Sequence, residues 1–119
     1  MGRILLCGLR EEAIATMSWS QWWVYSAANI SLDPEGFGVY ELGDEDKNTV
    51  YYGSGFIKIK MMYDYNTERC PTAKFYRFKL TGIEEESKVL ERTLLTEYKN
   101  THGKLPIYNG KDFLAKISI

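Results

Sequence analysis

Two short stretches rich in valine and tyrosine flank a polar loop near the middle of the chain, and this arrangement constrains the fold most strongly. The stretches are Gly38–Leu42 and Thr49–Gly53, and the loop is residues 43–48. β-branched and aromatic residues favour strands, and a short polar loop containing glycine between two such runs is typical of a β-hairpin. The sequence therefore predicts two adjacent antiparallel strands.

The residues after this hairpin predict a helix, a third strand and a second helix. Ile57–Tyr65 carries long apolar and lysine side chains and predicts a helix, whereas Lys74–Leu80 alternates in the manner of a strand. Thr81–Glu84 has the form of a capping box, from which a helix is expected to run to about Lys99. This order predicts the α+β class, with a small antiparallel three-stranded sheet flanked by helices.

The region before the hairpin gives a weaker signal. Residues 1–16 are interpreted as an N-terminal extension of uncertain structure. Ser18–Asn29 carries Trp19, Trp22 and Trp23, whose spacing fits one face of a helix. Such a cluster is expected to supply core area, and a platform on which nucleic acid bases stack is the alternative.

Size and charge limit the possible functions. A chain of 119 residues is expected to form one domain, residues 1–119, whose motif-bearing core is residues 37–109. The formal net charge of −1 disfavours indiscriminate binding of nucleic acid, which relies on a basic surface. Six lysines and arginines nevertheless fall between residues 58 and 79, so a local basic patch remains possible.

Cysteine and histidine usage argues against a zinc site. Cys7 and Cys70 lie far apart and the single histidine is His102, so no pair of ligands has the spacing of a zinc motif. The cysteines give no sign of a disulfide framework, which makes the cytoplasm the expected compartment. No apolar run is long enough to span a bilayer, so no membrane partner is expected.

Four short motifs occur in a fixed order on the expected elements. Gly38-Val39-Tyr40 and Tyr51-Tyr52-Gly53 lie on the two hairpin strands. Leu90-Glu91-x-x-Leu94-Leu95 lies on the second helix, and Pro106-x-Tyr108-Asn109 follows it. From residue 37 to residue 109 this set resembles the GIY-YIG nuclease superfamily, which includes the incision domain of the bacterial excision-repair endonuclease and intron homing endonucleases. It is similar in particular to small stand-alone prokaryotic members.

The resemblance implies a metal-dependent phosphodiesterase that acts on DNA. Hydrolysis of a phosphodiester needs an activated water, a divalent cation and a cationic side chain on the phosphate. The resemblance assigns the role of base to Tyr40 and that of its support to Tyr51. It makes Glu91 the ligand of a single Mg²⁺ or Mn²⁺ ion and gives Asn109 the task of tying the terminal loop to the site.

Further residues are assigned around this centre. Glu91 lies roughly 60° from the middle of the apolar helix face, on its border, where a carboxylate is half sheltered. Glu97 lies at a similar angle on the other border and is the second choice for the metal ligand. Tyr65 matches an aromatic position of the repair enzymes, and Ser54 stands where they often carry a lysine, so both are expected to contact the substrate.

One residue departs from the pattern. The superfamily places an arginine on the first helix where this chain has Met61. Lys60 is the nearest replacement for contact with the phosphate and Lys58 is the next, although a lysine lacks the two-pronged geometry of a guanidinium. The enzyme is therefore expected to be weak or degenerate. The alternative is a non-catalytic module on the same fold that binds nucleic acid or protein.

Overall fold

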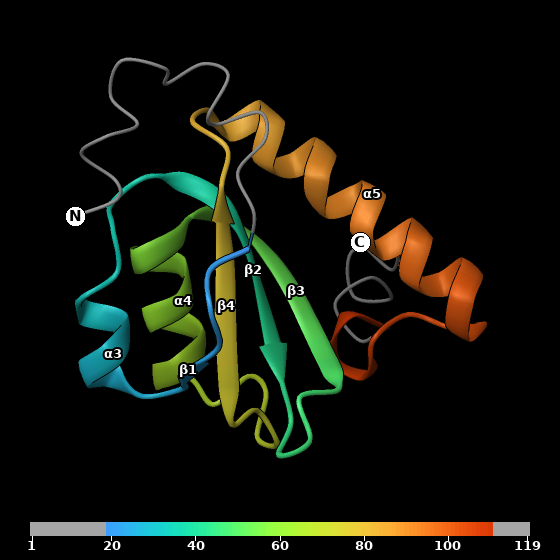
Figure 1. Cartoon of the computed structure of the whole chain (residues 1–119), viewed down its shortest axis with the longest axis horizontal. Coiled ribbons are helices and arrows are strands. Elements are labelled where there is room, and N and C mark those ends of the chain that lie inside the picture. The colour runs from blue at the N-terminus through green and yellow to red at the C-terminus, as the bar shows by residue number, and fades with distance from the viewer. Residues whose placement is uncertain (1–18, 111–119) are drawn as a thin grey trace.

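The computed structural model describes residues 19–110, and the expected N-terminal extension of residues 1–16 lies outside them. Within this range a sheet of four strands is combined with helices α3, α4 and α5, and residues 107–110 are also helical (Figure 1). In chain order the elements are β1 (Trp23–Val24), α3 (Ala27–Ser31), β2 (Phe37–Gly43), β3 (Thr49–Phe56), α4 (Ile57–Asn66), β4 (Phe75–Leu80) and α5 (Glu84–His102). The fold is therefore α+β, as the sequence predicts.

The sheet is antiparallel throughout, with the strand order β1-β4-β2-β3. The predicted hairpin is confirmed: β2 pairs with β3, and Leu42 lies opposite Tyr51 while Tyr40 lies opposite Gly53. The predicted third strand, β4, pairs with the other side of β2. The strand containing the first tyrosine motif is thus central, and the strand containing the second is at an edge.

The prediction of three strands is one too few, because β1 adds a fourth. Trp23 pairs with Tyr76 at the edge of β4, in the middle of the segment that was expected to be a helix. Helix α3 begins only at Ala27, where the Ser26 hydroxyl accepts a hydrogen bond from the Asn29 amide as an N-cap. The helix expected over Ser18–Asn29 is therefore wrong, since aromatic residues are at least as favourable in a strand.

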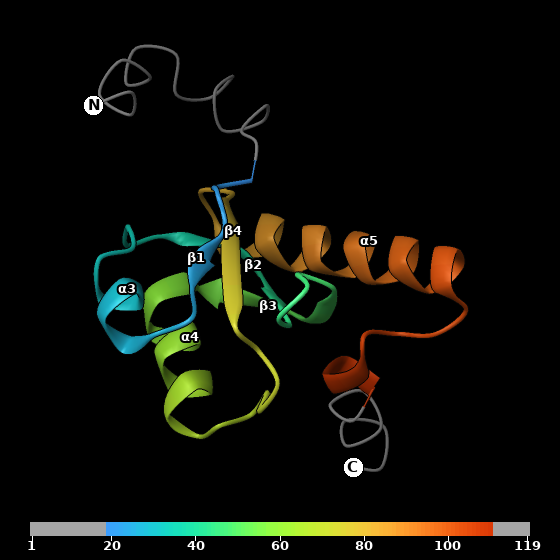
Figure 2. The same cartoon turned by 60° about the horizontal axis from the view of Figure 1, so that its bottom comes forward.

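The two faces of the sheet are covered by different helices (Figure 2). Helices α3 and α4 lie on one face and α5 crosses β2 and β3 on the other. The core lies under α4, because successive strand residues alternate between faces and the larger apolar side chains point that way. Its main members are Tyr40, Leu42, Tyr51, Tyr76 and Phe78 from the strands, with Ile57 and Met61 from α4.

The start of α5 differs from the predicted capping box. Ile83 is the N-cap residue and provides no side-chain hydrogen bond, while the Thr81 hydroxyl donates to the Ile83 carbonyl. Glutamates 84–86 still occupy the first turn, where the helix dipole favours negative charge. At the other end Gly103 has φ of +80°, a left-handed conformation that favours glycine and ends the helix. Among residues 19–110, no helix is both long and apolar enough to span a membrane.

Candidate functional site

Tyr40 lies in the core, and its hydroxyl donates a hydrogen bond to a carboxylate oxygen of Asp64 on α4. Both side chains are fully buried. The other carboxylate oxygen of Asp64 accepts a hydrogen bond from Arg69 Nε at 2.9 Å, which compensates its charge. Burial raises the pKa of Tyr40 well above its usual range, and the negative charge of Asp64 raises it further. At neutral pH the phenol therefore stays protonated.

Tyr51 lies on the same face of the sheet as Tyr40. Their ring centroids are 6.2 Å apart, and the Tyr51 side chain is almost fully buried. The register of the hairpin causes this, because Tyr51 is opposite Leu42 and Gly53 is opposite Tyr40. The structure thus brings the two predicted tyrosines together, inside the core.

Glu91 lies on the other side of the sheet. It projects from α5, is half-buried, and accepts a hydrogen bond from the Ser54 hydroxyl at 2.5 Å. Ser54 pairs with Val39 and follows Tyr51 by three positions on a regularly paired strand, so the two side chains point to opposite faces. The structure therefore does not place Glu91 beside the two tyrosines. Glu97, the second choice, is exposed further along the same helix.

These residues do not form a ready metal site. Within the range 19–110 no group of three or more histidine, cysteine, aspartate or glutamate side chains is suited to hold a metal ion. Glu91 is a single carboxylate with one oxygen bonded to Ser54. Mg²⁺ is often held by one or two carboxylates together with substrate phosphates. Glu91 alone does not supply a preformed cradle for such an ion.

The basic side chains of α4 diverge. Met61, where the resemblance predicts an arginine, is fully buried in the core. Lys58 faces α3, with its ammonium nitrogen 3.9 Å from a carboxylate oxygen of Glu35. Lys60 is about 200° further round the helix. Across residues 19–110 it forms no ion pair within 4.0 Å. Tyr65, predicted to contact substrate, packs edge-on against Tyr25 with ring centroids 5.1 Å apart.

Asn109 joins the end of the described chain to the sheet. Its side-chain amide accepts a hydrogen bond from the Tyr52 backbone N–H at 2.8 Å and donates one to the Tyr52 carbonyl at 2.9 Å. The amide therefore occupies the place of a neighbouring strand along the outer edge of β3. Asn109 therefore fixes this end of the described chain to β3.

Arg77 forms a second polar centre that the sequence did not reveal. Its Nε donates to Glu41 at 2.7 Å, and Glu41 is almost fully buried on the face opposite Tyr40. The guanidinium carbon lies 4.6 Å from the ring centre of Trp22 and 4.9 Å from that of Trp19. These two indole rings therefore cover an internal ion pair, and only Trp23 lies apart from them, on β1. The sign of this pair in the sequence was the presence of opposite charges, Glu41 and Arg77, on two segments expected to be strands.

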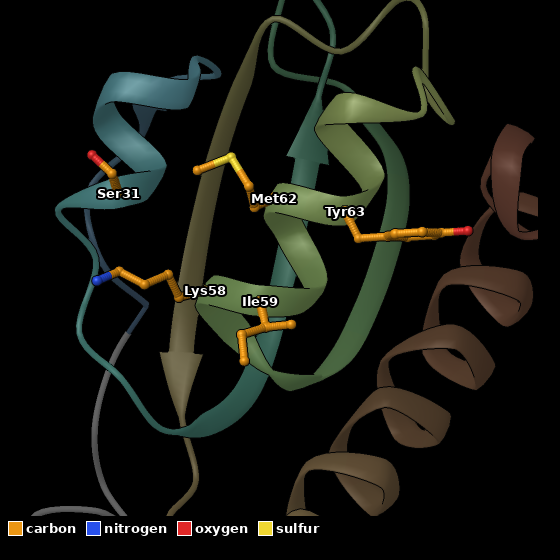
Figure 3. A pocket seen from close by; sticks show the side chains of 5 residues that line it. All are labelled: Ser31, Lys58, Ile59, Met62 and Tyr63. Carbon is orange, nitrogen blue, oxygen red and sulfur yellow. The ribbon is translucent and has the colours of Figure 1, made fainter.

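A shallow hollow of about 470 Å³ lies on the outer surface of α3 and α4 (Figure 3). Two exposed apolar side chains line it: Ile59 has 67% of its surface exposed and Tyr63 has 58%. Sequence reasoning assigned these residues only to an unusually apolar helix. The lining residues are Ser31, Lys58, Ile59, Met62 and Tyr63.

Residues 17–101 match the family model described as domain of unknown function DUF7508. The chain belongs to the DUF7508 family. The matched range contains the whole sheet, α4 and almost all of α5, including Tyr40, Tyr51 and Glu91, and it ends before Asn109. No curated protein and no solved structure matches the chain.

Proposed function

We propose that this DUF7508 domain is a non-catalytic protein-binding module on a scaffold that resembles the GIY-YIG nucleases. One observation carries this proposal: the Tyr40 hydroxyl donates to the buried Asp64 carboxylate, on the face of the sheet opposite Glu91. A general base has to reach the proton that it removes. A phenol held in the core by an internal carboxylate, with a raised pKa, does not meet that condition.

The distribution of charge favours protein over nucleic acid as the partner. Arg69 and Arg77 both bind buried carboxylates, those of Asp64 and Glu41. Their charges are therefore largely compensated inside the protein, whereas affinity for nucleic acid depends on cations that are available to phosphates. Two exposed apolar side chains, Ile59 and Tyr63, instead lie one turn apart on α4, and adjacent exposed apolar residues are typical of a surface that contacts another protein. We place the protein in the cytoplasm, the compartment expected from its cysteines.

Weak cleavage of DNA in the presence of Mg²⁺ or Mn²⁺ is the second candidate function. Two features of the described residues favour it. Glu91 is half-buried beside the edge strand β3, and Lys60 on α4 carries a charge that no carboxylate among them compensates by a close ion pair. In this alternative Glu91 would be the residue that holds the ion and Lys60 the residue that contacts a phosphate.

A cleavage assay separates the two functions. Supercoiled plasmid is incubated with Mn²⁺ and the wild-type protein, with Glu91→Gln, with Lys60→Arg, or with the matched control Glu86→Gln, which changes an exposed glutamate of the same helix. We expect no cleavage by any of the four. Cleavage that is lost in Glu91→Gln and retained in Glu86→Gln would overturn the proposal and establish the nuclease.

A gel-retardation assay at low salt tests the choice of partner. We expect the wild-type protein not to retard duplex or single-stranded DNA, because Arg69 and Arg77 are each paired with a buried carboxylate. Retardation that weakens on changing Lys60 to Gln would instead show that a basic site for nucleic acid is present on α4.

A further inference from the structure

The exposed side of α4 carries an apolar stripe. Successive helical residues turn by about 100°, so the buried residues Ile57 and Met61 define the inward direction. Ile59, Met62 and Tyr63 then point outward or sideways, and all three line the hollow beside α3 (Figure 3). A contiguous exposed apolar surface of this kind is typical of a site that contacts another molecule.

Lysines border this stripe on both sides. Lys58 lies on the border that faces α3, and Lys60 lies on the opposite border of the same helix. The only acidic residue of α4 is Asp64, which is buried and bound to Arg69, and α3 has no charged residue at all. Glu35 is an exposed acid beside this surface, and its carboxylate is 3.9 Å from Lys58, at the limit of an ion pair. The exposed charges of the two helices are therefore exclusively positive.

We propose that this surface binds an amphipathic helical segment of a partner protein, with a large apolar side chain in the hollow and carboxylates on both flanks. The apolar side chain would contact Ile59, Met62 and Tyr63, and the carboxylates would pair with Lys58 and Lys60. The inference rests on the proposed function, because it names the partner of a module that acts by binding protein. The length of α4, about 15 Å at 1.5 Å per residue, matches about three turns of a partner helix.

The shape and lining of the surface favour this partner over two others. The side chains form a hollow, which receives a protruding side chain, whereas a protein that docks on a lipid surface inserts side chains of its own. Four of the five lining residues are uncharged and none is an arginine, which disfavours a phosphate backbone.

Selection of peptides on the folded protein tests the proposal. A phage library of random peptides of about 15 residues, the length at which isolated helices become stable, is selected on the wild-type protein. The selected peptides are then synthesised and measured by fluorescence anisotropy. We expect them to carry a large apolar residue and an excess of aspartate and glutamate. Enrichment of basic peptides, or of none, overturns the proposal.

Substitutions then locate the binding site. Ile59→Asp combined with Tyr63→Asp should abolish binding, whereas Val89→Asp, which changes a similarly exposed apolar residue of α5, should leave it unchanged. All three positions are exposed, so unchanged circular dichroism will show that the variants fold. Charge reversal at Lys58 and Lys60 should weaken binding of the acidic peptides by roughly tenfold or more. Equal binding to the wild type and the Ile59→Asp/Tyr63→Asp variant would overturn the assignment.

Two further results separate this inference from its alternatives. Vesicles of equal parts phosphatidylcholine and phosphatidylserine are mixed with the protein and sedimented. Sedimentation that depends on Ile59, with no selected acidic peptide, would replace the protein partner by a membrane. Metal-dependent plasmid cleavage that requires Glu91 would refute the non-catalytic function alone, since the peptide measurements do not depend on it.

Discussion

The substitution Gly53→Ala tests the packing that holds Tyr40 in the core. A Cβ atom at position 53 would lie 2.5 Å from the Tyr40 hydroxyl oxygen and 2.7 Å from Cε2 of its ring. Ordinary contacts between such atoms need about 3.5 Å. The ring of Tyr40 therefore has to move by about 1 Å, and because it is fully buried with its hydroxyl bonded to Asp64, this movement disrupts the hydrogen bond.

Three effects determine the size of the loss. Loss of a hydrogen bond to a charged group costs about 1.5–3 kcal/mol. Overpacking of a core costs about 1–3 kcal/mol. Alanine in a strand recovers about 0.5–1 kcal/mol relative to glycine, because the unfolded chain has less freedom to lose. The unfavourable effects win, and we expect the free energy of unfolding to fall by about 3 kcal/mol.

Urea denaturation followed by circular dichroism measures this change. With a slope of about 1–3 kcal/mol per molar urea, the midpoint should fall by about 1–3 M. Gly110→Ala is the control, because its Cβ would meet no atom within 4 Å. In a double-mutant cycle, Gly53→Ala should cost much less in the Tyr40→Leu background than in the wild type, since the ring that clashes is then absent. The packing argument would be refuted if the Gly53→Ala protein were as stable as the wild type. It would also be refuted if Gly53→Ala cost as much in the Tyr40→Leu background as in the wild type.

Three other predictions concern the polar contacts of the structure. Asn109→Ala should lower the free energy of unfolding by about 2–4 kcal/mol, because both backbone groups of Tyr52 lose their partner, and hydrogen exchange at the Tyr52 amide should accelerate. The contribution of Tyr40 to stability should be constant up to pH about 10, the pKa of an unfolded tyrosine. It should fall above that pH because burial raises the pKa of Tyr40 in the folded state. Ultraviolet absorbance of phenolate should therefore rise together with unfolding. Arg77→Met should cost about 3 kcal/mol by leaving Glu41 buried without its cation, and the Glu41→Gln/Arg77→Met protein should regain much of it in the same urea assay.

The local part of the fold could be predicted from the sequence. The hairpin, β4 and α5 each have a periodicity of their own, and a short loop makes two neighbouring strands pair. The apolar residues of α4 follow no clear helical period, and this helix was predicted from its long apolar and lysine side chains. β1 could not be predicted, because a strand of two residues has no periodicity. Its pairing of Trp23 with Tyr76 depends on a strand that lies more than fifty residues later. The spacing of the tryptophans, which fits a helix, therefore led to a wrong prediction for this segment.

The candidate site was predicted less well than the fold. Alternation along β3 already places Tyr51 and Ser54 on opposite faces. The sequence does not show which helix covers which face of the sheet. Glu91 contacts Ser54 because α5 covers the face to which Ser54 points. The partner of Tyr40 was missed for a related reason. Asp64 is the one acid on a helix of apolar and lysine residues, but its burial becomes evident only when α4 is packed on the sheet.

The two tripeptides that resemble nuclease motifs have a sufficient explanation in packing. A Cβ atom at Gly53 would occupy the space of the Tyr40 ring, so the glycine of the second motif makes room for the tyrosine of the first. A Cβ atom at Gly38 would lie 2.7 Å from Cδ1 of Ile57 and 3.0 Å from Cα of Leu80, so the first glycine allows β4 and α4 to approach β2. The two glycines and the tyrosine are thus accounted for by the packing of the core, whether or not a reaction takes place. In this chain the motif is therefore evidence for the scaffold, and evidence for a function has to come from the exposed residues of α4 and α5.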